Sequence, residues 1–89
     1  MPLTPLQFKL RVTNETEQWM RAAHTFLQHH ADLAYNQQEL LDALSPDIGL
    51  DTASLSQALH ELIYLGGVEA RRHGTLMYYR YLDPIPEFE

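Results

Sequence analysis

Hydrophobic and polar positions divide the first third of the chain into an alternating segment and a helical one. From Leu6 to Val12, apolar and polar residues alternate, which predicts a half-buried strand or arm. Asn14 and Glu17 then have the three-residue spacing of a capping box, so we expect a helix to begin after Asn14. Six residues follow at helical spacing and should form its inner face: Trp19, Met20, Ala23, Phe26, Leu27 and His30.

A short apolar stretch and a second helix come next. Residues 33–35 have the length and character of a short strand, and Asn36 with Glu39 repeats the capping signal. We predict a helix over residues 37–44, with three leucines on its inner face: Leu40, Leu41 and Leu44.

Residues 45–50 predict the turn between the second and third helices. Pro46 cannot easily continue a helix, and Gly49 permits a positive φ. Asp51 then offers an N-cap side chain, whose carboxylate also suits the positive end of the helix dipole. The third helix should end before Gly66, with three leucines facing the core: Leu55, Leu59 and Leu62.

The last third of the chain has the pattern of a hairpin. Residues 68–72 form the first predicted strand, His73 and Gly74 form the turn, and residues 75–82 form a return strand rich in β-forming side chains. Pro84 ends the ladder, because proline has no backbone N–H to donate. A β-hairpin therefore follows the third helix directly.

These elements define a single α+β domain over residues 1–89, with three helices, a small antiparallel sheet and an additional N-terminal strand or arm. We divide it into an arm (1–13), a core (14–82) and a C-terminal tail (83–89), which ends in an acidic stretch at residues 87–89. With 89 residues and no cysteine, the fold has to be held by apolar burial. No apolar run approaches the ~20 residues that span a bilayer. The N-terminus lacks the layout of a secretory signal, so we expect a cytoplasmic protein with no membrane partner.

The sequence offers little for catalysis or for a cofactor. It has no cysteine nucleophile, no glycine-rich phosphate loop and no paired-carboxylate motif, so we expect neither enzymatic activity nor a cofactor. His24, His29 and His30 invite a metal interpretation. However, two ligands on one helix face should be three or four residues apart, and these are five, six and one apart. We therefore predict no metal site.

The third helix and the hairpin carry a family resemblance. Its residues, in chain order, are Leu55, Ser56, Gln57, Leu59 and Leu62 on the helix, then Gly66, Val68, Arg71, Arg72, Gly74, Tyr78, Tyr79 and Arg80 on the hairpin. In this order they resemble the winged helix-turn-helix transcription regulators, especially the ArsR-like and MarR-like repressors. The close match covers about a third of the chain, and the helix order upstream of it is compatible.

The resemblance implies a winged helix that binds double-stranded DNA, with the third helix in the major groove and the hairpin beside it. The candidate DNA-binding residues are Thr52, Ser54, Ser56, Gln57, His60, Arg71, Arg72 and His73. Gln57 is chemically able to read adenine through a bidentate pair. Gly67 replaces a bulky apolar residue of these regulators, which predicts a more open start to the first hairpin strand. A homodimer would use the first helix or the strand of residues 6–12.

Charge favours a second interpretation. Six Lys+Arg against twelve Asp+Glu give a net charge of -6, and the third helix has no Lys or Arg. Nucleic-acid binders are usually basic, so the alternative is a winged-helix module that docks on a protein partner and binds no DNA. For Arg71 and Arg72 the two alternatives are a DNA contact and a salt bridge to Glu69 or to a neighbouring carboxylate. Lys9 and Arg11 of the arm are further candidates for DNA contact.

Overall fold

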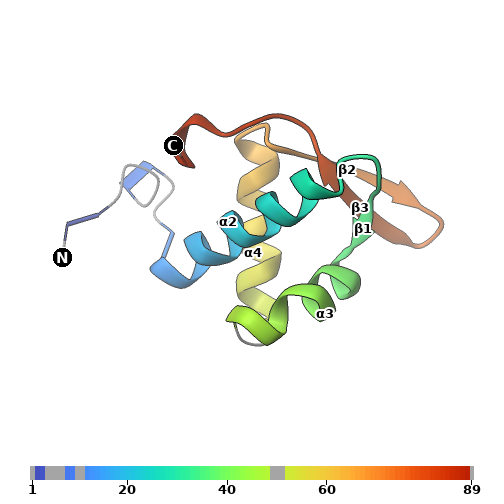
Figure 1. Cartoon of the computed structure of the whole chain (residues 1–89), viewed down its shortest axis with the longest axis horizontal. Coiled ribbons are helices and arrows are strands. Elements are labelled where there is room, and N and C mark those ends of the chain that lie inside the picture. The colour runs from blue at the N-terminus through green and yellow to red at the C-terminus, as the bar shows by residue number, and fades with distance from the viewer. Residues whose placement is uncertain (1, 4–7, 10–11, 49–51, 89) are drawn as a thin grey trace.

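Three helices and a three-stranded antiparallel sheet make up the described part of the fold (Figure 1). The computed structural model describes residues 2–3, 8–9, 12–48 and 52–88, and at 45–48 and 87 it describes the backbone alone. The elements in chain order are α2 (Asn14–His29), β1 (Tyr35–Asn36), α3 (Gln37–Ile48), α4 (Thr52–Tyr64), β2 (Val68–His73), β3 (Leu76–Tyr81) and the short 3-10 helix η1 (Pro86–Phe88). The predicted α+β class is confirmed, and the arrangement is compatible with the predicted winged helix.

The predicted N-terminal strand is not part of the described sheet. Of residues 6–12, the structure describes Phe8, Lys9 and Val12; the first two are helical and Val12 lies outside any regular element. Val12 is nevertheless buried, so this residue of the arm belongs to the core. The other residues of this prediction lie outside the described ranges.

α2 begins one residue earlier than the capping pattern predicted. Thr13 is the N-cap, and its Oγ1 accepts a hydrogen bond from the Thr16 backbone N–H at 3.2 Å. Glu17 pairs with Arg21 one turn further along the helix. The first turn contains Glu15 and Glu17, whose carboxylates interact favourably with the positive end of the helix dipole.

The capping box of the second helix is confirmed, but its predicted end is wrong. Asn36 Oδ1 accepts from the Glu39 backbone N–H at 2.8 Å, and Glu39 Oε1 accepts from the Asn36 backbone N–H at 2.9 Å. α3 runs to Ile48 and not to Leu44, so it passes through Pro46. A proline inside a helix has no backbone N–H to donate to the carbonyl four residues earlier, so α3 lacks one hydrogen bond of its ladder at this position.

α4 ends in the glycine cap that the sequence predicted. Gly66 has a φ of 81°, and its N–H donates to the Ile63 carbonyl at 3.0 Å. The Gly67 N–H donates to the Leu62 carbonyl at 3.0 Å. This Schellman pattern satisfies two carbonyls at the helix end and turns the chain into β2. Residues 49–51, among them the predicted N-cap aspartate, lie outside the described ranges.

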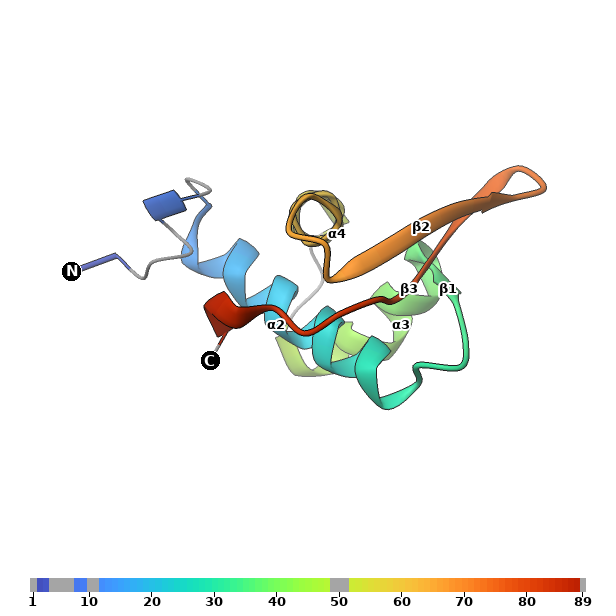
Figure 2. The ribbon, with the colours of Figure 1, turned by 90° about the horizontal axis from the view of Figure 1, so that it is seen from above.

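β3 is the central strand of the sheet, with β1 on one side and β2 on the other. Tyr79 pairs with Tyr35 of β1 and with Ala70 of β2. β2 and β3 join through a two-residue turn in which Gly74 has a φ of 67°, the positive value that tight hairpin turns need. The hairpin projects away from the helices (Figure 2), and residues 71–77 are all exposed.

The core lies where α2 crosses α4, and the C-terminal segment covers one end of it. The largest fully buried side chains come from the helices and the start of β2: Met20, Leu27, Leu40, Leu55, Leu59, Leu62 and Val68. After β3 the chain turns back along α2 (Figure 1), and Ile85 is only 2% exposed. The described part of the predicted C-terminal tail, residues 83–88, therefore packs on α2 through Ile85 and through hydrogen bonds to the Asp83 and Phe88 carbonyls. No helix within the described ranges is long and apolar enough to cross a bilayer.

Candidate nucleic-acid interface

α4 presents an outer face of polar, uncharged side chains. Of the five predicted contact residues on this helix, Ser54 is half-buried and four are exposed: Thr52, Ser56, Gln57 and His60. The helix carries no Lys or Arg, and its one acidic residue, Glu61, is half-buried. Towards its C-terminal end, Ile63 and Tyr64 are 40% and 71% exposed. The outer face is therefore polar at its start and apolar at its end.

Gln57 has a partner inside the molecule. Thr16 Oγ1, in the first turn of α2, donates to Gln57 Oε1 at 3.5 Å. Bidentate recognition of adenine uses both the carbonyl and the amino group of a glutamine side chain. Gln57 would therefore have to release this long, weak hydrogen bond before it could read a base.

The sheet register divides the hairpin into two faces, because directly paired residues of antiparallel strands point to the same side. Val68, Tyr79 and Tyr81 mark the inner face, since they lie in or against the core. The outer face follows from the alternation and consists of Glu69, Arg71, His73, Leu76, Tyr78 and Arg80. Arg72, paired with Met77, falls on the inner side but near the exposed tip.

Arg71 forms the salt bridge that the sequence offered as one of its two roles. Its Nε donates to Glu69 Oε1 at 2.9 Å. The arginine side chain is 78% exposed and the glutamate side chain 28% exposed. The pair therefore leaves the two Nη nitrogens of Arg71 accessible to solvent or to an anion.

The remaining predicted contact residues of the hairpin are exposed. Arg72 and His73 are both exposed, and the His73 ring lies edge-on to the Tyr78 ring, with centroids 5.9 Å apart. Arg80 is not among the predicted contact residues, yet it lies on the outer face directly across from Glu69. The hairpin register is the signal that identifies it, and the register is known only once the turn length is known.

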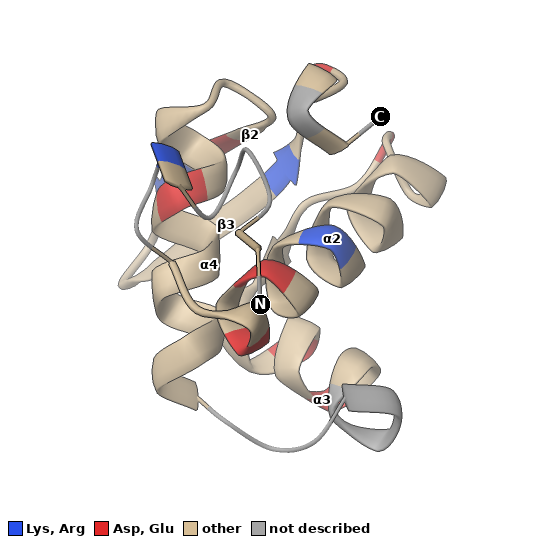
Figure 3. Cartoon of the chain, turned by 90° about the vertical axis from the view of Figure 1, so that its left-hand side faces the viewer, with Lys and Arg blue, Asp and Glu red and all other residues tan. Residues whose placement is uncertain are grey.

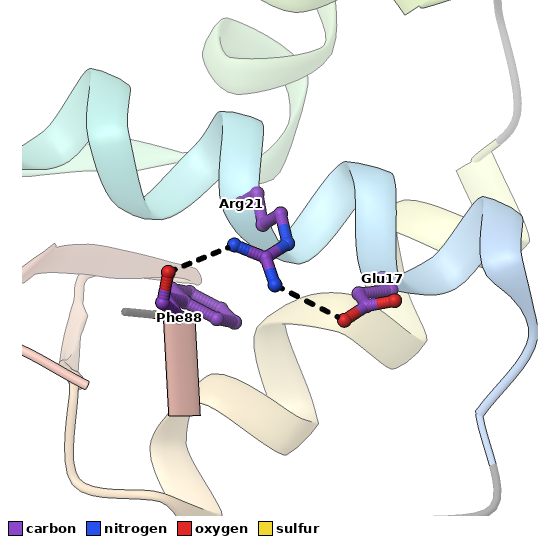
Figure 4. Close-up of polar contacts among 3 residues, drawn as sticks. All are labelled: Glu17, Arg21 and Phe88. Carbon is purple, nitrogen blue, oxygen red and sulfur yellow. Dashed lines mark hydrogen bonds and ion pairs between the residues drawn. The ribbon is translucent and has the colours of Figure 1, made fainter. Parts of the chain in front are cut away.

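Arg21, by contrast, makes a structural contact (Figure 4). Its Nη2 donates to Glu17 Oε1 at 3.3 Å, and its Nη1 donates to the Phe88 carbonyl at 3.1 Å. Its guanidinium carbon lies 4.8 Å from the centre of the Phe88 ring. These contacts tie α2 to the C-terminal segment. The first turn of α2 carries two glutamates (Figure 3), whereas the hairpin carries three arginines.

Gly67 does not open the start of β2, and that prediction is wrong. A Cβ at this position would lie 2.6 Å from Ile85 Cγ1 and 3.1 Å from His24 Nε2. Ile85 fills the space that a bulky side chain at 67 would occupy. His24 Nε2 donates to the Asp83 carbonyl at 2.9 Å, because a carbonyl can only accept, and this bond fixes the segment. Within the described residues, no three His, Asp or Glu side chains form a set that could hold a metal ion.

A groove of about 340 Å³ lies between the first turn of α3 and the hairpin. Its lining includes the amide side chains of Gln37 and Gln38 and the apolar side chains of Leu76 and Met77. Leu76 is 49% exposed and Met77 is 41% exposed. The hairpin therefore offers apolar surface near its tip as well as positive charge.

Comparison with models of protein families, with curated proteins and with solved structures gave no significant match. The functional assignment that follows therefore rests on the geometry of α4 and the hairpin and on the resemblance of their sequence to winged-helix regulators.

Proposed function

We propose that this protein is a small winged-helix DNA-binding protein, a dimeric transcription regulator that binds double-stranded DNA through α4 and the hairpin. The observation that carries the proposal is an exposed polar helix face followed directly by a projecting hairpin with three arginines. The order α2-β1-α3-α4-β2-β3 and the sheet order β1-β3-β2 support the winged-helix assignment. The resemblance of residues 55–81 to such regulators points the same way.

In this proposal α4 reads bases and the hairpin provides most of the affinity. Ser56 and His60 form hydrogen bonds to base edges in the major groove, and Gln57 joins them after releasing Thr16. Arg71 and Arg72 contact phosphates, which contribute sequence-independent affinity that falls steeply with salt. α4 can read bases without carrying positive charge, because the arginines of the hairpin provide the contacts to phosphates.

The test is fluorescence anisotropy with a mixed-sequence DNA duplex between about 50 and 200 mM salt. The Arg71→Ala/Arg72→Ala variant should bind more weakly, and the slope of log K against log salt should fall by about 1.8 for two lost phosphate contacts. Arg21→Ala removes a positive charge away from the hairpin and should leave the slope unchanged. Absence of salt-dependent binding by the wild type, or wild-type binding by the double variant, would overturn the proposal.

A second candidate function, a protein-docking module, is favoured by the apolar surface of α4 and the hairpin. Ile63 and Tyr64 on α4 and Leu76 and Met77 near the hairpin tip are all at least 40% exposed. In this proposal the same helix face docks on an apolar protein surface and DNA is not bound. Affinity capture should then recover a partner that Ile63→Ser/Tyr64→Ser loses and Arg71→Ala/Arg72→Ala retains. Tight, salt-sensitive DNA binding with no captured partner would count against docking.

The proposed dimer uses α2 or the N-terminal arm. Phe8 of the arm is 77% exposed, so it is an apolar side chain that a second copy would cover. Analytical ultracentrifugation of wild type and Phe8→Ser tests this contact. If Phe8→Ser converts a dimer into a monomer, the arm forms the dimer contact. If the dimer persists, the arm does not form it.

A further inference from the structure

The outer face of the hairpin contains a second arginine, Arg80, which was not among the predicted contact residues. The register pairs Glu69 with Arg80 and Arg71 with Tyr78, so all four side chains lie on one side of the sheet. Arg71 and Arg80 are diagonal neighbours, a relation that places residues about 7–8 Å apart. Two guanidinium groups therefore share a surface with one tyrosine ring and one carboxylate.

Glu69 lies beside both arginines. It is directly across from Arg80, and it accepts the Arg71 Nε–H at 2.9 Å. The side chain of Arg80 makes no hydrogen bond or ion pair with any residue that the structure describes. The carboxylate therefore offsets one of the two positive charges on this face, while N–H groups of both guanidinium groups stay available for other acceptors.

The pair of Glu69 and Arg71 contributes little to the fold. Its arginine side chain is 78% exposed, and exposed ion pairs of this kind stabilise proteins weakly. Loss of the carboxylate should therefore change the charge of the face and leave the hairpin folded. The Glu69 carboxylate is therefore suited to adjusting the affinity for a ligand and not to stabilising the fold.

We propose that the outer face of the hairpin, and not its tip alone, contacts the phosphate backbone of duplex DNA, and that Glu69 holds this affinity down. Arg71 and Arg80 bind the phosphates. Glu69 competes with the phosphates for the Arg71 guanidinium, and its negative charge makes the electrostatic potential at Arg80 less positive. This inference rests on the proposed DNA binding of the protein. It adds Arg80 to the contacting residues and gives Glu69 an opposing role.

The experiment compares Glu69→Gln with wild type by anisotropy on the mixed-sequence duplex over the same range of salt. Glu69→Gln should bind about three- to tenfold more tightly, with a slope of log K against log salt steeper by up to about 0.9. Arg80→Gln should bind more weakly, with a slope shallower by about 0.9. Asp32→Asn is the matched control, because it removes one exposed negative charge in the turn after α2 and leaves the hairpin unchanged.

Thermal unfolding of each variant checks that the fold is retained. If Glu69→Gln binds no more tightly than Asp32→Asn, while the wild type shows salt-dependent binding, the inference about Glu69 is wrong and the proposed function is unaffected. If Arg80→Gln binds as the wild type does, the outer face is not the contacting surface. If neither wild type nor Glu69→Gln binds the duplex at low salt, the proposed function fails together with the inference.

Discussion

The arginine of α2 and the arginines of the hairpin differ in how many of their nitrogen atoms contact other residues of the domain. Arg21 uses both Nη groups and the face of its guanidinium within the molecule, on Glu17 and Phe88. On the hairpin, the Arg71 side chain uses one nitrogen, and the side chains of Arg72 and Arg80 make no hydrogen bond or ion pair with any described residue. The number of internal partners, and not the residue type, separates a structural cation from one available to a ligand.

The difference follows from what lies beneath each region. α2 and the C-terminal segment lie over the core, where Ile85 is buried against Gly67 and His24. The hairpin extends beyond the core, and its far half is exposed on both faces. Side chains of the first region should therefore determine stability, and those of the second should affect binding with little effect on stability.

The largest expected effect belongs to Ile85. Ile85→Ala removes a buried side chain from the core and should lower the free energy of unfolding by about 2–4 kcal/mol. Met77→Ala, on the exposed part of the hairpin, should change it by less than about 0.5 kcal/mol. Urea denaturation of the three proteins measures both values. Similar midpoints for the two variants would mean that the C-terminal segment does not belong to the packed fold.

A smaller effect tests the contact between Gly67 and Ile85. Gly67→Ala places a Cβ against Ile85 and should cost about 1–3 kcal/mol through overpacking. In the Ile85→Ala background this cost should fall, because the clashing atoms are gone. Gly66→Ala is the matched control: its φ of 81° makes it strained, but a Cβ there meets no atom within 4 Å. The stability cost of Gly66→Ala should therefore be the same in the wild-type and Ile85→Ala backgrounds. If the costs of Gly66→Ala and Gly67→Ala changed equally between the two backgrounds, the contact between Gly67 and Ile85 would be contradicted.

The elements that the sequence predicted well depend on neighbouring residues. The capping box of Asn36 and Glu39 and the glycine cap at Gly66 involve partners within five positions, so their patterns are visible in the chain itself. Pro46 led to the wrong predicted end of α3, because a proline can stand either after a helix or within its last turn, and the sequence does not distinguish the two. The N-cap of α2 shifted by one residue because Thr13 and Asn14 are both competent caps.

The contacts that the sequence could not predict join distant residues. His24 and Asp83 are 59 positions apart, and Thr16 and Gln57 are 41 positions apart. Ile85 lies between two prolines in a segment with no apolar period, so nothing local indicates that it is buried. The same holds for the candidate interface. Its eight predicted residues come from the chain itself, but the face on which Arg80 lies and the partner of Gln57 depend on the assembled sheet and helices.

The next prediction concerns Arg21 itself. Arg21→Ala removes the guanidinium from a Glu17 side chain that is only 7% exposed and releases the Phe88 carbonyl. Because Arg21 is itself 45% exposed, solvent screens the pair, and the expected loss of stability is about 1 kcal/mol. Arg21→Lys keeps the charge but cannot form the two-pronged contact, so it should recover part of the loss. Equal stability of wild type and Arg21→Ala in urea denaturation would show that the contact contributes nothing.

The smallest effect on stability is expected at Arg72, which is exposed near the hairpin tip. Arg72→Ala should change the free energy of unfolding by less than about 0.5 kcal/mol, because no internal contact is lost. In the DNA-binding proposal, the same change should reduce the slope of log K against log salt by about 0.9, since one phosphate contact is removed. Urea denaturation and anisotropy on the same preparation separate the two effects. A variant that loses stability but keeps its salt dependence would reverse the contrast between the hairpin and α2, and would make Arg72 a structural residue like Arg21.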